Sequence, residues 1–297
     1  MKEKLKGIFS KLKILVPKKT SELQIPKDVV YRSDVKFGQG GDRALKMDIL
    51  HPRTLPNVPM PVLVWIHSGA FRGGSKREGL PQLLPFAQQG YFCATIEYRL
   101  SHEAIFPAQI EDCKCGIRYL RVHAKMFHLD PDRIGVWGSS AGGYLAALLG
   151  ITHHVKEFEG KGGWEGFSSR VQAVCDWFGP TDFLRISDFP SQIDRNAANA
   201  PEALLIGGPL QENKEKVARA NPITYLTKEA SPFLIMHAED DPLVPFNQSQ
   251  LLVEALQQAG VEVTFEVIEG GKHDGKKFYS PDVLKKVENF FKKHLEP

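Results

Sequence analysis

A glycine-rich turn near the middle of the chain carries the strongest chemical signal in the sequence. The segment 138–143 reads Gly-Ser-Ser-Ala-Gly-Gly and lies between an apolar run at 134–137 and a helical pattern at 141–151. The pattern Gly-x-Ser-x-Gly between a strand and a helix holds its serine in a strained conformation, with the hydroxyl above the sheet edge. We therefore expect Ser140 to act as a nucleophile, and Ser139, at the variable position, is the weaker candidate.

Two other interpretations of this turn fit the sequence less well. A plain connection between a strand and a helix would not need these small residues, and a phosphate-binding loop would carry the lysine of a P-loop, which is missing. A serine hydroxyl is barely ionised at neutral pH, so a nucleophilic serine needs a general base and a carboxylate that orients this base.

The base is expected after the acid along the chain, because sheets with this type of turn use the order serine, acid, histidine. Two histidines follow a suitable acid. His294 lies in a helical pattern three residues from the C-terminus, whereas His273 lies in the glycine-rich segment 269–275, directly after the last expected strand. His273 is therefore the predicted base.

Three neighbouring carboxylates compete for the role of the acid. Glu239, Asp240 and Asp241 follow the expected strand 233–237. We favour Asp241, because the rigid proline and the two apolar residues after it can anchor the loop, and because a short side chain holds a fixed geometry better than Glu239. Asp240 stays an alternative, since the direction of a loop is not visible in a sequence. His237 is interpreted as a structural residue at the end of the strand.

Attack on a carbonyl group builds negative charge on its oxygen, which preorganised backbone N–H groups must stabilise. The glycine-rich segment 67–74 follows the apolar run 62–66 and can supply such groups at the sheet edge. The amides of Gly69 and Ala70, together with that of Ala141 behind the nucleophile, are the predicted oxyanion hole. His67, at the start of this segment, is expected to brace the loop.

Strand and helix patterns alternate from residue 29 onward, which predicts one doubly wound α/β domain. The first two strands alternate polar and apolar residues around a turn at 38–41 and are expected to form an antiparallel hairpin. The later apolar runs are typical of a parallel sheet covered on both faces. The expected strands span 29–37, 44–50, 62–67, 92–98, 134–137, 171–178, 233–237 and 263–268, and the expected helices 80–89, 107–125, 141–151, 247–259 and 282–294.

The ends and long connections of this domain suggest additional parts. Residues 1–24 form a basic extension with apolar residues at helical spacing, and residues 25–297 form the α/β domain. The extension is interpreted as a solvated segment, with a helix that contacts a membrane surface or a partner as the alternative. The connections 153–170 and 182–221 are longer than usual, which suggests lid-like insertions over a pocket.

Composition and charge exclude several classes of protein. Residues 1–19 carry seven lysines and one glutamate, a balance of 7 − 1 = +6, so the net charge of +3 leaves 3 − 6 = −3 for the rest of the chain. A mildly acidic body without a basic stripe argues against nucleic acid as the partner. The longest apolar run is far shorter than the roughly 18 residues of a membrane-spanning helix.

The cysteines and histidines do not form a recognisable metal or disulfide pattern. The spacing of the four cysteines suits neither a zinc site nor a disulfide framework, which favours reduced thiols and a cytoplasmic location. His153, His154 and Glu157 could be drawn as a metal site, but adjacent histidines point apart on a helix or strand. We expect neither a metal nor a cofactor.

With these motifs the chain resembles a known group, the α/β-hydrolase fold, and within it the esterases related to hormone-sensitive lipase. It is most similar to the bifunctional feruloyl and acetyl xylan esterase type. The resemblance rests on segments 46–50, 67–74, 97–101, 106–109, 130–134, 138–143, 176–182 and 237–245. It implies Ser140, Asp241 and His273 as nucleophile, acid and base, and thereby favours Asp241 over Asp240. One departure is Ser68, where the family usually has glycine, so the loop is expected to adapt less freely.

The residues and the resemblance together predict a serine carboxylesterase that needs no cofactor and works through an acyl-enzyme. The resemblance implies a small ester with a short acyl chain, such as an acetyl or feruloyl ester of a plant-wall saccharide. A peptidase or amidase of the same fold is one alternative, and a fold without catalysis that binds a ligand is another. The oligomeric state is left open.

Overall fold

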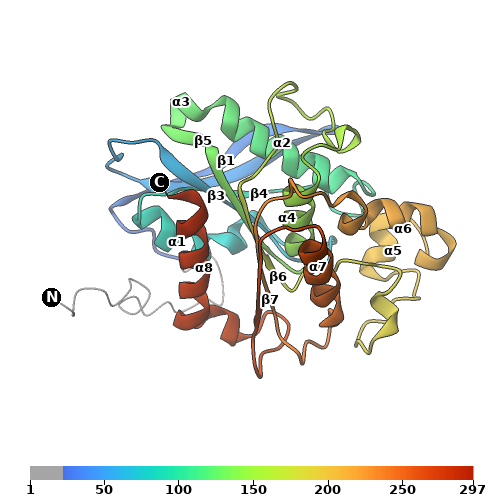
Figure 1. The fold of residues 1–297 in the computed structure, drawn as a ribbon. Helices are drawn as coiled ribbons and strands as arrows, with labels where there is room; N and C mark the ends of the chain where they lie inside the picture. The colour runs from blue at the N-terminus through green and yellow to red at the C-terminus, as the bar shows by residue number, and fades with distance from the viewer. Residues whose placement is uncertain (1–22, 297) are drawn as a thin grey trace.

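Short runs of β-branched and aromatic residues form an eight-stranded sheet in the computed structural model, which describes residues 23–296 (Figure 1). The spatial order of the strands is β1-β2-β4-β3-β5-β6-β7-β8. β2 pairs antiparallel with both of its neighbours, β1 and β4, and all other neighbouring strands pair parallel. The strands are β1 (Val29–Gly40), β2 (Arg43–Pro52), β3 (Met60–Ile66), β4 (Phe92–Ile96), β5 (Leu129–Ser139), β6 (Ala173–Trp177), β7 (Phe233–His237) and β8 (Val263–Val267).

The predicted antiparallel hairpin is present, but the predicted position of its turn is wrong. β1 continues through Gly38 to Gly40, and the turn lies at 41–42. Register shifts between Arg32 and Val35 and between Lys36 and Gly38 show bulges in this strand. Because a bulge absorbs an extra residue into a strand, Gly38 and Gly40 stay paired with β2, and Gly41 is the glycine of the predicted segment that lies in the turn.

Helices cover both faces of the sheet, as expected for parallel strands whose side chains are apolar on both sides (Figure 1). Along β3, Val64 and Ile66 join the core under α2, α4 and α7, whereas Leu63 and Trp65 join the core under α1 and α8. The helices are α1 (Leu80–Gln88), α2 (Ala108–Val122), α3 (Ala124–Phe127), α4 (Ala141–Ile151), α5 (Pro201–Ile206), α6 (Lys214–Ala220), α7 (Asn247–Gln258) and α8 (Pro281–Leu295). The helix expected at 107–125 is thus divided into α2 and α3.

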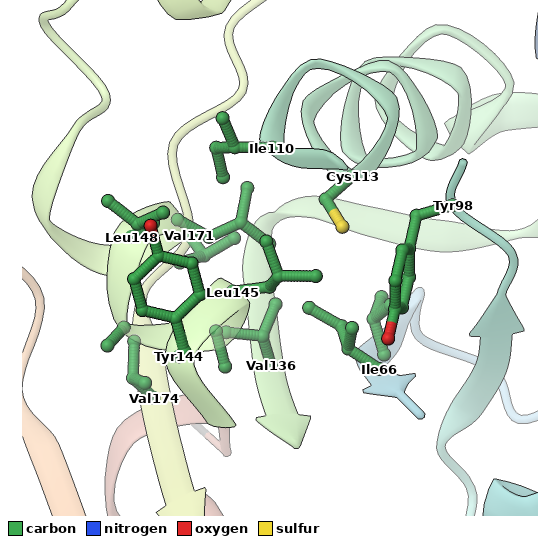
Figure 2. Close-up of a cluster of buried hydrophobic side chains, with 14 of the residues drawn as sticks. Ile66, Tyr98, Ile110, Cys113, Val136, Tyr144, Leu145, Leu148, Val171 and Val174 are labelled. Atoms are coloured by element: carbon green, nitrogen blue, oxygen red, sulfur yellow. The ribbon is translucent and has the colours of Figure 1, made fainter. Parts of the chain in front are cut away.

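The core beneath α4 fixes the helix that follows the glycine-rich turn. Tyr144 and Leu145 of α4 are fully buried against side chains of the central strands, among them Val136 of β5 and Val174 of β6 (Figure 2). The phenol of Tyr144 donates a hydrogen bond to the carbonyl of Ala220, 2.7 Å away, so its polar end is satisfied inside the core. This packing ties α4 both to the sheet and to the end of α6.

The two long connections lie at different places. Segment 153–170 contains η4 (Lys156–Phe158) and packs on α2, where Arg118 donates hydrogen bonds to the carbonyls of Glu159 and Gly163. Segment 182–221 contains η5 (Ile186–Asp188), η6 (Leu210–Glu212), α5 and α6.

All four cysteines are free and buried. Within residues 23–296, no helix combines the length and the apolar character that a membrane crossing requires.

Asp176, on β6, is a carboxyl group enclosed in this core. It is 1% exposed and accepts a hydrogen bond from the backbone N–H of Gly179 at 2.9 Å. Burial raises the pKa of Asp176 from 3.8 to about 7, although the Gly179 hydrogen bond opposes this shift. The folded protein therefore holds this proton over a pH range in which the unfolded chain has already released it.

We expect Asp176→Asn to remove a pH dependence from the free energy of unfolding. Because the pKa is raised on folding, the parent loses stability as the pH rises from about 4 to about 7. The loss is on the order of 3 to 4 kcal/mol for a shift of about three units. Urea unfolding of both proteins at several pH values measures this difference. If the free energies of unfolding of the parent and of Asp176→Asn change in parallel across that pH range, the raised pKa of Asp176 is contradicted.

Candidate active site

The turn after β5 places Ser140 in the strained conformation that the sequence pattern predicts. Ser140 has φ 53° and ψ −120°, and its N–H donates to the carbonyl of Trp177 at 2.8 Å. A Cβ atom at Gly138 would lie 2.2 Å from the carbonyl oxygen of Gly142, and one at Gly142 would lie 2.1 Å from that of Ile66. Larger residues at these two positions would therefore push the serine out of place.

The structure brings Ser140, His273 and Asp241 into one chain of hydrogen bonds. Nε2 of His273 lies 3.1 Å from Oγ of Ser140, and Nδ1 of His273 lies 2.7 Å from Oδ2 of Asp241. These distances are within the range for a nucleophile, a base and the group that orients the base. Asp240, the alternative acid, lies on the exposed side of the loop, and Ser139 remains within β5.

Asp241 is held as a carboxylate by several donors. Its Oδ1 accepts the N–H groups of Leu243 and Val244 at 2.8 and 3.0 Å, and its Oδ2 faces His237 and His273. Burial alone would raise the pKa of Asp241, but the hydrogen bonds from His237 and His273 hold it well below its usual range. A carboxylate that stays ionised can stabilise positive charge on His273.

His237 is a second histidine on this carboxylate and has no exposed surface. Its Nε2 lies 3.0 Å from the carbonyl of Val244 and 3.2 Å from Oδ2 of Asp241, and its Nδ1 lies 2.7 Å from the hydroxyl of Ser249. A carbonyl oxygen only accepts, so Nε2 must carry a proton that it shares between Val244 and Asp241. His237 is therefore more than the strand-end residue that the sequence suggests.

His273 comes from the loop after β8 and packs against an aromatic ring. The ring centroids of His273 and Phe178 lie 4.6 Å apart. The next residue, Asp274, has a φ of 50° and accepts a hydrogen bond from the hydroxyl of Tyr279. These contacts set the direction of the loop, so that the imidazole spans the gap between Asp241 and Ser140.

The backbone groups predicted for the oxyanion hole line the same cavity as Ser140. Gly69, Ala70 and Ala141 all belong to its wall. None of their N–H groups has an acceptor within residues 23–296. Ala70 and Phe71 both have positive φ values, 53° and 59°, which is a sparsely populated conformation for residues with a side chain. Backbone N–H groups without an acceptor can stabilise an oxyanion when they point at it.

His67 braces the loop that carries these amides. Its ring stacks on that of Tyr98 with centroids 4.3 Å apart, and its Nδ1 lies 2.7 Å from the carbonyl of Ser68. Burial lowers the pKa of His67 to about 4, so its ring is neutral at pH 7. The Tyr98 hydroxyl donates to the carbonyl of His67 at 3.0 Å. Ser68, the departure from the family pattern, does not adopt a positive φ.

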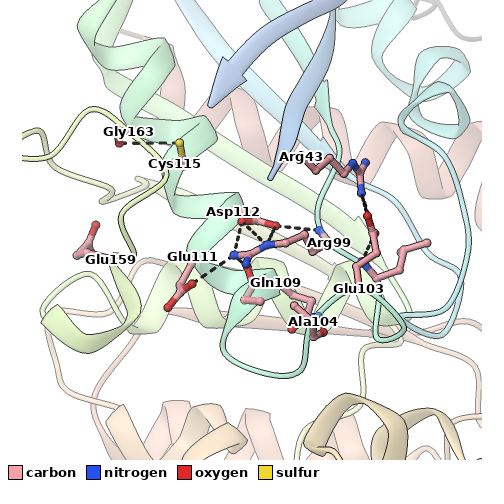
Figure 3. Close-up of polar contacts among 12 residues, drawn as sticks. Arg43, Arg99, Glu103, Ala104, Gln109, Glu111, Asp112, Cys115, Glu159 and Gly163 are labelled. Carbon is pink, nitrogen blue, oxygen red and sulfur yellow. Dashed lines mark hydrogen bonds and ion pairs between the residues drawn. The ribbon is translucent and has the colours of Figure 1, made fainter. Parts of the chain in front are cut away.

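Ion pairs hold the neighbouring loop 97–104, which supports the loop of Gly69, Ala70 and Phe71. The N–H of Ser101 donates to the carbonyl of Phe71 at 2.7 Å. Arg99 in turn binds Asp112 of α2, with Nη2 2.7 Å from Oδ1, and Arg43 binds Glu103 at 2.8 Å (Figure 3). The loop is therefore anchored to α2 on one side and to β2 on the other.

The cavity above Ser140 has a volume of about 220 Å³. Segment 182–221 contributes Ile193, Arg195, Pro201 and Glu202 to its wall. Segment 153–170 instead borders a separate cavity beside Arg118. Of the two long connections, segment 182–221 is thus the one that lines the cavity at Ser140.

Residues 47–256, more than half of the chain, match the family described as BD-FAE. The chain belongs to the BD-FAE family. This result confirms the α/β-hydrolase esterase family that the sequence motifs predicted, and the eight-stranded, mostly parallel sheet agrees with it.

Curated relatives with similar sequences include two proteins of Mycobacterium tuberculosis. The "probable carboxylic ester hydrolase LipM" is 32% identical over 80% of this chain and 54% of its own length. The "esterase LipC" is 31% identical over 77% of this chain and 55% of its own length. The chain therefore spans about half the length of the curated relatives that it matches.

One similar solved structure is described as a carbohydrate esterase, and another as a bifunctional GH43-CE protein. A truncated carbohydrate esterase from gut microbiota is 31% identical, has a TM-score of 0.79, and the match covers 89% of this chain and 95% of that one. A bifunctional GH43-CE protein of Bacteroides eggerthii is 34% identical with a TM-score of 0.80, covering 89% of this chain and 35% of that one.

Removal of the hydrogen bond from His237 to Asp241 is expected to slow the predicted ester hydrolysis rather than weaken binding of the ester. A hydrogen bond to a charged group contributes about 1.5 to 3 kcal/mol, so His237→Phe should lower kcat roughly 10- to 100-fold with little change in KM. His237→Gln keeps a side-chain N–H and should recover part of this loss. Steady-state kinetics over a pH range, with Tm as a check on folding, measure both variants. Equal kinetics for His237→Phe and the parent would remove this positioning role.

Proposed function

We propose that this protein is a serine carboxylesterase that hydrolyses short-chain acyl esters through an acyl-enzyme. The observation that carries the proposal is the hydrogen-bonded chain of Ser140, His273 and Asp241. Ser140 lines a cavity together with Gly69, Ala70 and Ala141, whose N–H groups have no acceptor among the described residues 23–296. Relatives that are described as esterases and carboxylic ester hydrolases support it.

The first half of the reaction acylates the serine. His273 accepts the proton of Ser140 through Nε2 while Oγ forms a bond to the ester carbonyl carbon. The N–H groups of Gly69, Ala70 and Ala141 stabilise the oxyanion, and Asp241 stabilises the imidazolium. When the bond between carbon and the alcohol oxygen breaks, His273 returns the proton to the leaving alcohol.

Water completes the reaction by the same route. His273 removes a proton from the water while the water oxygen bonds to the acyl carbon, and the proton then passes to Oγ of Ser140 as the acyl bond breaks. The products are a carboxylic acid and free Ser140. No step of this reaction requires a cofactor.

The size of the cavity favours a small acyl group. Its volume of about 220 Å³ lies below the roughly 300 to 1,000 Å³ of pockets for drug-sized ligands. Acetyl esters of plant-wall saccharides are therefore the preferred candidate substrates, with feruloyl esters as the larger alternative. The similar solved structure described as a carbohydrate esterase supports a saccharide as the alcohol. A cytoplasmic location stays a prediction.

Substitution of the nucleophile tests the mechanism directly. Ser140→Ala should lower kcat for 4-nitrophenyl acetate by about 10⁴-fold or more, because loss of a nucleophilic serine removes the covalent route. Ser139→Ala, at the neighbouring position in β5, is the matched control and should stay close to the parent. Turnover of the ester by Ser140→Ala at the parent's rate would exclude the proposed mechanism and leave a ligand-binding fold as the better interpretation.

A comparison of esters with amides tests the alternative of a peptidase or amidase. We expect the parent to hydrolyse 4-nitrophenyl acetate readily and aminoacyl 4-nitroanilides at least about 10³-fold more slowly in kcat/KM, a difference of about 4 kcal/mol in transition-state stabilisation. The release of nitrophenol and nitroaniline is followed in the same buffer. Higher kcat/KM for the anilides would identify the protein as an amidase.

A further inference from the structure

The two backbone N–H groups that bind Asp241 belong to rigid peptide units. The N–H of Leu243 shares a planar trans peptide with the carbonyl of Pro242, and the N–H of Val244 shares one with the carbonyl of Leu243. Both N–H groups donate to Oδ1 of Asp241, at 2.8 and 3.0 Å. The C=O and N–H of a trans peptide point in opposite directions, so groups that bind the two carbonyls also set the direction of the two N–H groups.

Segment 182–221 binds both of these carbonyls. The backbone N–H of Gln192 donates to the carbonyl of Pro242 at 2.7 Å. The hydroxyl of Ser191 donates to the carbonyl of Leu243 at 2.8 Å. Both peptide units are thus held between the acid on one side and this segment on the other.

Arg195 gives the carbonyl of Leu243 a second donor. Nη2 of Arg195 donates to this oxygen, which has two lone pairs and so has both of them bound. A hydrogen bond from a charged group is roughly twice as strong as one between neutral groups. Hydrogen bonds in a chain also polarise one another, so this bond strengthens the N–H of Val244 as a donor to Asp241. Of the three donors from the segment, Arg195 therefore has the largest influence on the acid.

A buried glutamate keeps Arg195 in this position. Nη1 of Arg195 pairs with Oε1 of Glu202, and the side chain of each is 3% exposed. Glu202 lies on α5, which is bound to the loop before α2, because the N–H of Phe106 donates to the carbonyl of Leu205 at 2.8 Å. A buried ion pair is a weak source of stability, since apolar residues of similar volume often serve equally well. An apolar residue could not, however, place a charged donor on one chosen carbonyl.

We propose that Arg195 is a positioning residue for the acid, and that it acts on Asp241 through the peptide unit between Leu243 and Val244. The inference rests on the proposed esterase function and gives a part in it to a residue outside the hydrogen-bonded chain of serine, histidine and acid. A carboxylate that keeps its direction holds His273 in the orientation and tautomer that catalysis needs. Loss of the guanidinium should therefore change kcat more than KM.

The experiment removes the ion pair in two steps. Glu202→Gln removes the negative charge but leaves Arg195 bound to the carbonyl of Leu243, and so serves as the reference. Arg195→Met in the Glu202→Gln background removes this bond and leaves neither charge of the pair behind. Compared with the reference, the double variant should lose about tenfold in kcat for 4-nitrophenyl acetate, with a much smaller change in KM. Tm is recorded for every variant.

Two further variants test the same carbonyl. Arg195→Lys keeps the charge and one donor nitrogen, so it should retain more kcat than the double variant. Ser191→Ala removes the other donor to Leu243 without disturbing a charge, and it should lower kcat about threefold. Ser191→Ala decides the question if the variants of the ion pair do not fold.

A second measurement separates positioning from general support of the fold. The two steps are repeated with Asp241→Asn, which leaves no carboxylate to position. If Arg195 acts through Asp241, the loss between the reference and the double variant should shrink there to less than about twofold, because residues that act as a unit are not additive. A structural role alone would keep the tenfold loss.

The control is Arg118→Met, which removes another buried arginine of the same kind. Arg118 pairs with Glu159 at 2.6 Å and donates to the carbonyl of Gly163 at 3.1 Å, beside a separate cavity. Glu159 keeps Lys114 as a partner at 2.8 Å, so this variant leaves no buried carboxylate unpaired. It should lower Tm and leave kcat close to that of the parent.

Three results would overturn the positioning role. They are equal kcat in the double variant and the reference, a tenfold loss that persists without the carboxylate of Asp241, and an equal fall in kcat in Arg118→Met. The proposed function itself fails in a different way, which is that the parent does not hydrolyse 4-nitrophenyl acetate or that Ser140→Ala hydrolyses it equally fast.

Discussion

The strained backbone at Ser140 is the constraint on which the rest of the site depends. A positive φ for a serine costs roughly 1 to 3 kcal/mol, and it persists only where the surrounding structure enforces it. Three adjacent strands supply that enforcement. β5 leads into the turn, the carbonyl of Trp177 at the end of β6 accepts the N–H of Ser140, and Gly142 lies directly against the carbonyl of Ile66 at the end of β3. The turn therefore cannot relax unless this part of the sheet moves.

The parallel arrangement of the strands explains how residues far apart in the chain reach one another. The carboxyl ends of β3, β5, β7 and β8 open on the same edge of the sheet, and the loops after them carry the oxyanion amides, Ser140, Asp241 and His273. Neighbouring strands lie about 4.8 Å apart, so side chains of moderate length can span the distances between these loops. The fold thus provides the spacing, and the loops provide the direction of each side chain.

Much of this was predictable from the sequence, for physical reasons that differ between residues. Ser140 and His273 lie in turns whose small residues are themselves a signal, and the periodicity of the apolar runs predicts the sheet and its covering helices. The choice between Asp240 and Asp241 depends on loop direction, which the N–H groups of Leu243 and Val244 set by binding the Asp241 carboxylate. Arg195 and Glu202 form a buried ion pair in the cavity wall, and this pair leaves no sequence signal, because segment 182–221 has no regular period and burial there arises only from tertiary packing.

The two buried carboxyl groups next to the turn show how hydrogen-bond donors decide their charge. Both are removed from water, and burial raises the pKa of each when it acts alone. Asp241 faces two histidines, whose hydrogen bonds and charge outweigh the effect of burial on its pKa, whereas Asp176 receives only the N–H of Gly179 among the described residues and keeps a raised pKa. A short loop with a fixed backbone can thus place a carboxylate in a buried site. Arg195 binds the carbonyl of Leu243 in this same loop, so segment 182–221 is tied directly to the loop that carries Asp241.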